Sequence, residues 1–115
     1  MTQDDYRERT KFVSKLGTCL HQCGATSGRI ELHLLRLCEL LGINGAFLYT
    51  PTGFTFCYWI DDPADQLVQV KRLQPSGSDL GRLERIDALM TRFEDQKLSF
   101  EEMFEIFEKE DRSYD

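Results

Sequence analysis

The spacing of apolar residues changes twice along this chain of 115 residues, and these changes largely decide its fold. Up to Leu41, and again from Leu80, apolar residues recur every three or four positions, as in helices buried along one face. Between residues 46 and 73 they recur every second position, as in strands. We therefore expect an α+β fold with two N-terminal helices, a three-stranded sheet and two C-terminal helices.

Residues typical of helix ends mark the limits of the two N-terminal helices. The first is predicted over residues 4–23, and Gly24 follows where a left-handed residue ends many helices. Ser27 or Thr26 can cap the second helix, and Gly42 ends it. The short linker predicts an antiparallel helix pair. The expected buried positions are Phe12, Leu16, Cys19, Leu20 and Cys23 in the first helix, and Ile30, Leu34, Leu35, Cys38 and Leu41 in the second.

Three strands are predicted over residues 46–50, 54–60 and 66–73. Pro51 and Gly53 lie between the first two strands, as in a hairpin turn. Connections this short allow only antiparallel pairing, because parallel strands need a long crossover. Both faces of the second strand are largely apolar, so it should be covered on both sides or lie centrally in the sheet.

Capping residues also mark the two C-terminal helices. Asp79 is a suitable N-cap for the third helix. Ser99 and Glu102 have the spacing of a capping box at the start of the fourth, and Leu98 can pack on Met103 as a hydrophobic staple. The chain length is typical of a single domain, here residues 1–115.

The composition excludes several classes of protein. A net charge of −6 without a cluster of Lys and Arg argues against nucleic-acid binding. No apolar run approaches the roughly 18–20 residues that cross a bilayer, and the N-terminus does not resemble a secretory signal. We therefore expect a soluble chain in the cytosol, with reduced and mostly buried cysteines.

Candidate chemistry is sparse. Cys19, His21 and Cys23 could suggest a metal site, but His21 lies on the opposite side of the helix from the two thiols, so no metal is predicted. Glu31 and His33 also diverge, being two positions apart. We find no nucleophile elbow and no phosphate loop, and therefore predict no catalytic residue, no cofactor and no enzyme activity.

Three charged residues near element ends form the candidate ligand site. They are Glu31, Arg72 and Asp79. Such a trio could bind a small zwitterion, because arginine offers two parallel donors to a carboxylate. The simpler interpretation is a structural salt bridge and a helix cap.

Four segments, in this order and spacing, resemble the N-terminal domain of the threonine/serine exporter family. They are Gln22–Glu31, Tyr49–Gly53, Gly77–Leu80 and Leu98–Glu102. The resemblance implies the cytoplasmic domain of a protein of the inner (plasma) membrane that exports amino acids or small organic acids. This chain stops at Asp115, about where the membrane part of the family should begin, so it is either an excised domain or a free-standing relative.

The expected function is therefore to support or regulate transport. The partners implied are a membrane-transporter region in the same or another chain, a small amino-acid or organic-acid ligand and, as a further option, a second copy of the chain. A free-standing protein-interaction module and a small hydrolase are the alternatives.

Overall fold

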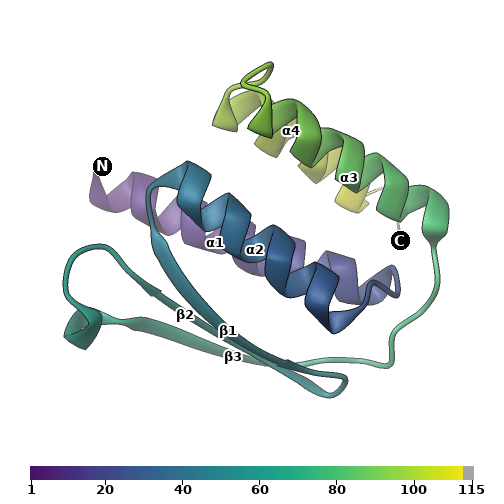
Figure 1. Cartoon of the computed structure of the whole chain (residues 1–115), viewed down its shortest axis with the longest axis horizontal. Helices are drawn as coiled ribbons and strands as arrows, with labels where there is room; N and C mark the ends of the chain where they lie inside the picture. Colours follow the sequence, from purple (N-terminus) through teal and green to yellow (C-terminus); the bar gives the residue numbers. More distant parts are fainter. Residues whose placement is uncertain (113–115) are drawn as a thin grey trace.

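The computed structural model has the element order expected from the sequence (Figure 1). It describes the backbone of residues 1–112 and the side chains of residues 1–110. The elements are α1 (Gln3–Gln22), α2 (Ser27–Leu41), β1 (Asn44–Thr50), β2 (Gly53–Trp59), the 3-10 helix η1 (Pro63–Asp65), β3 (Leu67–Arg72), α3 (Leu80–Glu94) and α4 (Phe100–Arg112). The strands form one antiparallel sheet in the order β1-β2-β3, which confirms the α+β fold.

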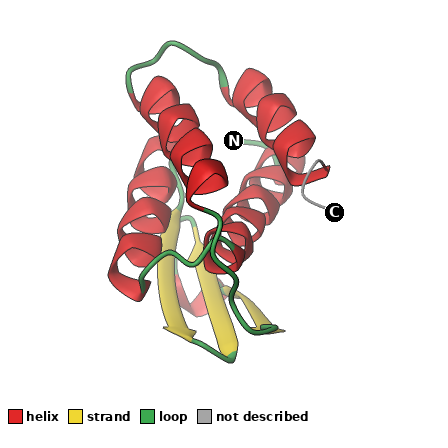
Figure 2. Ribbon diagram, turned by 90° about the vertical axis from the view of Figure 1, so that its right-hand side faces the viewer, coloured by secondary structure: helices red, strands yellow, loops and turns green. Residues whose placement is uncertain are grey.

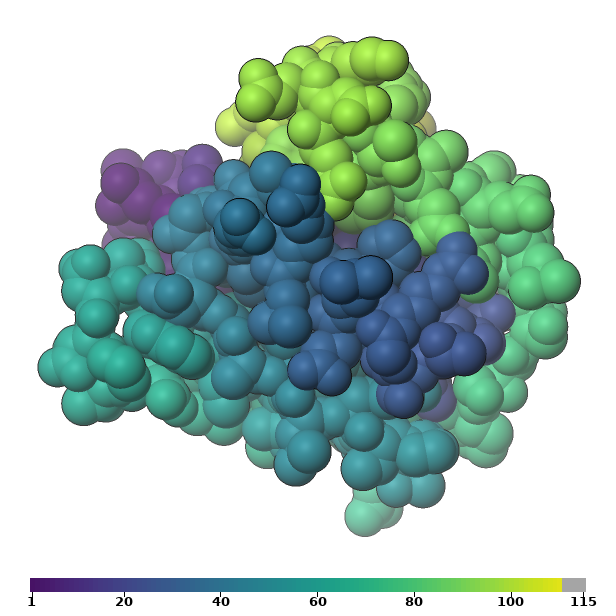
Figure 3. Space-filling model, in the orientation of Figure 1, coloured from purple at the N-terminus to yellow at the C-terminus, as the bar shows by residue number. Residues whose placement is uncertain are grey.

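The elements form three layers (Figures 1 and 2). Helices α1 and α2 cover one face of the sheet, and α3 and α4 lie on the far side of those helices. Phe12 of α1 joins the two helical layers, because its ring contacts three phenylalanines of α4 at centroid distances of 5.1–5.7 Å. The other face of the sheet carries no helix of the described chain. In the space-filling view, α2 occupies the middle of one broad side (Figure 3).

A close approach at Gly17 lets α1 pack on both α2 and the sheet. A Cβ atom at this position would lie 3.0 Å from Leu34 Cδ1 and 3.1 Å from the rings of Phe54 and Phe56. That separation is tighter than normal packing, so a larger residue would force the layers apart. The core of the chain includes Phe12, Leu16, Leu20, Ile30, Leu34, Phe54, Phe56, Tyr58, Ile86, Met103 and Phe107.

Several helix caps predicted from the sequence are confirmed, and the structure has one further cap that was not predicted. Thr26, not Ser27, caps α2, since its hydroxyl accepts from Arg29 N at 3.3 Å. Ser99 and Glu102 form the predicted reciprocal bonds of 3.0 and 3.1 Å. Thr2 and Asp5 form a second capping box at the start of α1, which was not predicted from the sequence.

One detail of the expected burial is wrong. Leu35 is exposed, and Leu37 takes its place in the core. Because α2 carries leucines on several sides, the contacts of the tertiary structure decide which of them are buried. Strand β2 is central, as expected, but only one of its faces is fully covered: Phe54, Phe56 and Tyr58 are buried, whereas Thr55, Cys57 and Trp59 are half-buried.

Candidate functional site

The three charged residues predicted as a ligand site lie in different settings. Glu31 is exposed on α2, and Arg72 is exposed at the end of β3, opposite Gly53. Asp79 is the N-cap of α3, and its Oδ1 accepts from Arg82 N at 3.0 Å. Within the described residues, no hydrogen bond or ion pair joins any two of the three. Asp79 therefore has a structural role, and a shared ligand site stays a prediction.

The backbone around Asp79 is tied to the turn between α1 and α2. Asp79 N donates to Cys23 O at 3.1 Å, and Gly77 N donates to Gln22 O at 3.2 Å. Gly24, at φ +84°, makes this contact feasible, since an added Cβ would lie 2.6 Å from Gly77 O. Two segments that carry the family resemblance thus meet at one point of the fold.

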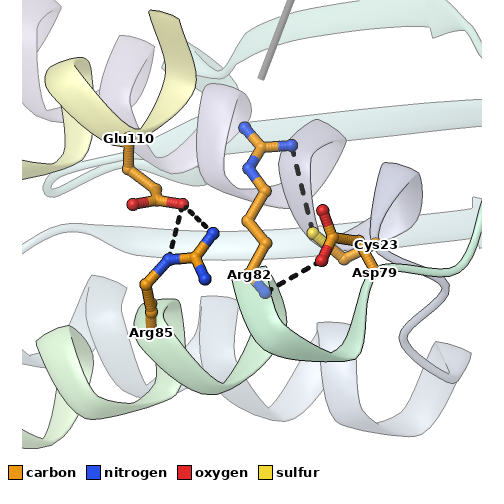
Figure 4. Close-up of polar contacts among 5 residues, drawn as sticks. All are labelled: Cys23, Asp79, Arg82, Arg85 and Glu110. Atoms are coloured by element: carbon orange, nitrogen blue, oxygen red, sulfur yellow. Dashed lines mark hydrogen bonds and ion pairs between the residues drawn. The ribbon is translucent and has the colours of Figure 1, made fainter. Parts of the chain in front are cut away.

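A buried arginine lies beside this junction (Figure 4). The Arg82 side chain is only 1% exposed and extends from α3 toward Cys23, where Nη1 lies 4.0 Å from Sγ. Burial raises the pKa of the Cys23 thiol, and the positive charge of Arg82 opposes that shift. Arg82 was not among the residues predicted from the sequence to be buried or functional, although its place four residues before Ile86 puts it on the buried face of α3.

Next to it, Arg85 pairs with Glu110 across α3 and α4 (Figure 4). Its Nε and Nη2 both donate to Glu110 Oε1, at 2.9 and 2.7 Å. Arg85 is largely exposed, so this pair, which joins α3 to α4, adds little to stability.

His21 is the centre of a second buried polar group. The Nε2 atom of His21 lies 2.6 Å from Gln74 O, and its Nδ1 atom lies 2.6 Å from the Tyr49 hydroxyl. Because a carbonyl only accepts, Nε2 must carry the proton, and Nδ1 of the neutral ring then accepts from Tyr49. His21 was predicted to lie away from the cysteines, but its burial was not predicted. The signal was its place one turn after Gly17, on the side of α1 that faces the sheet.

A third polar group joins α2 to α3. The Asp87 carboxylate pairs with Arg29, and His33 Nε2 lies 2.9 Å from Asp87 Oδ1. Burial, and then the neighbouring Arg29 guanidinium, lower the pKa of His33, while Glu94 opposes them. Within the described residues, no Ser, Thr or Cys side chain hydrogen-bonds to His33, and Glu31 faces solvent. The arrangement therefore connects two helices and does not assemble a nucleophile with a base.

A cleft of about 550 Å³ lies between the start of α1 and the segment from η1 to β3. Its walls carry both signs of charge, with Arg7 and Lys11 on one side and Asp65 on the other. The lining residues are Gln3, Tyr6, Arg7, Thr10, Lys11, Asp65, Gln66, Leu67 and Gln69. This volume is within the range of small-molecule sites, although its lining is more polar than most.

The part of the chain that the structure describes contains no cluster of three metal-ligating side chains. Cys19, Cys23 and Cys38 are buried, and Cys57 is half-buried. None of the described helices combines the length and apolar character needed to cross a membrane.

Comparison with known proteins identifies the family. A family model described as "Putative threonine/serine exporter" matches residues 11–114, which is nearly the whole chain. No curated protein and no solved structure matches it. The four segments that resemble this family, including the two that meet at Gly24 and Gly77, all lie inside the matched range. The chain therefore belongs to the threonine/serine exporter family.

Proposed function

We propose that this chain is a non-catalytic cytosolic domain that supports or regulates the export of threonine, serine or a related small organic acid. The membrane-spanning part would lie in the same chain or in a partner chain. The family match over residues 11–114 carries this proposal, because it covers the helices and the sheet together.

The polar groups of the fold support a non-catalytic role. Asp79 and Ser99 cap helices, His21 links α1 to β1, and Asp87 links α2 to α3. Each of these side chains has a structural partner that accounts for its position. Catalytic groups instead need a substrate-facing nucleophile, base or oxyanion donor.

Two places offer the charges that a zwitterionic amino acid needs for binding. One is the predicted trio of Glu31, Arg72 and Asp79, of which Asp79 is already engaged as a cap. The other is the cleft beside α1, where Arg7 and Lys11 can attract a carboxylate and Asp65 an ammonium group. A regulatory domain that responds to the exported compound would use one of these places.

Export by the full-length transporter tests the proposal. Glu31→Ala and Arg72→Ala, each in cells loaded with threonine, should reduce efflux while leaving the domain's melting temperature within a few degrees. Glu84→Ala is the matched control, since Glu84 is also exposed on a helix and has no hydrogen bond or ion pair within the described residues. Normal export from both stable variants would reject a role for Glu31 and Arg72.

Deletion of the whole domain from the transporter distinguishes a role in supporting export from the alternative that the domain is an unrelated protein-interaction module. Deletion should abolish or deregulate threonine efflux, and supplying the domain as a separate chain should restore it at least in part. Unchanged efflux after deletion would favour the interaction module.

The hydrolase alternative has its own test. Ser27 is the first residue of α2 and is exposed. Hydrolysis of an ester, amide or phosphate by the purified chain, lost on Ser27→Ala, would reject the non-catalytic proposal.

A further inference from the structure

The uncovered face of the sheet is apolar, although antiparallel sheets with one solvated face normally direct polar residues outward. On this side Val70 is 78% exposed, Leu48 68% and Val68 53%. The register aligns two rows across the strands, one from Ala46 through Cys57 to Val68 and the other from Leu48 through Thr55 to Val70. We call the following set the outer sheet face: Ala46, Leu48, Thr55, Cys57, Trp59, Val68 and Val70.

The seven residues of this set carry no charge, in a chain that is 30% charged, and Arg72, the next outward residue of β3, lies at the edge of the set. The net charge of −6 makes two copies repel one another over most of their surfaces. An uncharged apolar face is where two such copies can approach closely, and contiguous exposed apolar patches of this kind mark interaction sites.

Opposite charges lie at the two ends of this face. Arg72 shares the outward side of β3 with Val68 and Val70, and has no ion pair within the described residues. At the other end of the sheet, Asp61 and Asp62 follow β2 and are exposed. A two-fold axis that runs across the strands would bring the basic end of one sheet over the acidic end of the other.

We propose that two copies of the chain associate through the outer sheet face, with their strands running in opposite directions. Arg72 of each copy then lies near Asp61 and Asp62 of the other. Packed sheets lie about 10 Å apart with their strands roughly aligned, a spacing that side chains from both faces fill. The axis also sets Ala46 of one copy against Leu48 of the other, so that a small residue faces a large one.

The size of the face sets the strength of this contact. Three strands about 4.8 Å apart, each contributing about six residues, give a footprint of roughly 300 Å². Stable complexes bury about 800 Å² per partner, so we expect a reversible dimer with a dissociation constant of about 10 μM or weaker. The inference concerns assembly and does not depend on the proposed role in export.

Sedimentation equilibrium of the 115-residue chain, from about 10 to about 500 μM, measures this association. The mass should rise with concentration toward twice the 13.4 kDa of the monomer. Leu48→Lys and Val70→Lys should each weaken the dimer by about tenfold or more, because a buried lysine would lose its hydration. Leu32→Lys is the matched control, since Leu32 is 69% exposed but lies on α2, and it should leave the dimer unchanged.

Charge reversal tests the orientation. Arg72→Glu alone, and Asp61→Arg with Asp62→Arg, should each weaken the dimer, while the combined triple variant should restore it. Far-UV circular dichroism checks that every variant is folded. A wild-type chain that stays monomeric throughout, or equal loss with Leu32→Lys and Leu48→Lys, would overturn the proposal. A triple variant no tighter than its parents would overturn the arrangement in which the strands run in opposite directions.

Discussion

His21 Nδ1 accepts a hydrogen bond of 2.6 Å from the Tyr49 hydroxyl, which ties the last turn of α1 to β1. The other ring nitrogen donates to Gln74 O in the segment that leads from β3 to α3. One buried side chain therefore holds together a helix, a strand and a connecting segment. Because both of its nitrogens have partners, the loss of either partner leaves a buried polar atom unsatisfied.

Tyr49→Phe should lower the free energy of unfolding by about 1–2 kcal/mol, since Nδ1 of His21 loses its donor while remaining buried. Urea denaturation followed by circular dichroism measures the change. Tyr6→Phe is the control, because Tyr6 is also half-buried but makes no hydrogen bond through its hydroxyl within the described residues. An equal effect from both changes would contradict the structural role of this hydrogen bond.

Arg82→Ala should destabilise the chain by about 3 kcal/mol, because it removes a fully buried side chain and leaves a cavity between the helical layers. Arg85→Ala, on the same helix, should cost much less because Arg85 is largely exposed. Equilibrium unfolding of both variants under the same conditions gives the comparison. If the two losses are equal, Arg82 does not occupy the buried position beside Cys23.

Two glycines should respond in opposite ways to alanine. Gly28 lies in the first turn of α2, and no atom lies within 4 Å of an added Cβ, so Gly28→Ala should stabilise by about 0.5 kcal/mol. Gly24→Ala should destabilise by more than about 1 kcal/mol, because of the positive φ and the clash with Gly77 O. Melting temperatures of the pair provide the measurement. A gain in stability at position 24 would show that the turn has another conformation.

Stability should decrease as the pH falls through the titration of His33. Burial and Arg29 lower the pKa of His33 from its ordinary 6.5. Asp87 would favour the charged ring, but its carboxylate is already paired with Arg29. The unfolded chain therefore binds the proton more readily, so this contribution is complete above about pH 6.5 and is lost as the pH falls through the folded-state pKa.

The free energies of unfolding at about pH 7 and about pH 5.5 test whether stability falls with pH in this direction, with His33→Gln as the comparison. The variant should lose less stability on acidification than the wild type. A greater loss in the variant would mean that Asp87, and not burial, dominates the titration of His33.

The sequence predicted the elements well where local chemistry determines them. Asp79, Ser99 and Glu102 form the caps expected of them, because a cap depends only on residues three positions apart. The alternation from residue 46 onward correctly predicted the strands, and the short turns predicted their antiparallel order. Strand β1 begins two residues earlier than expected, at Asn44.

Features that depend on packing between distant segments were not predictable in this way. Burial of His21 depends on Tyr49 and Gln74, which lie 28 and 53 residues further along the chain. Val68 and Val70 are exposed because no second layer from the described residues covers that side of the sheet, and alternation alone does not reveal which faces are covered. For the predicted trio, the sequence identified the cap at Asp79, whereas joint binding by Glu31, Arg72 and Asp79 stays a prediction.

The contact between α1 and α4 has a consequence for the order of folding during synthesis. Phe12 packs on Phe107, and Lys15 donates to Glu108, which lies 93 residues further along the chain. The sheet, by contrast, pairs only neighbouring strands, and such local contacts form quickly. Helix α1 is made before α4, so part of its apolar side stays uncovered until α4 has emerged, and during that interval it offers an apolar surface to a chaperone at the ribosome.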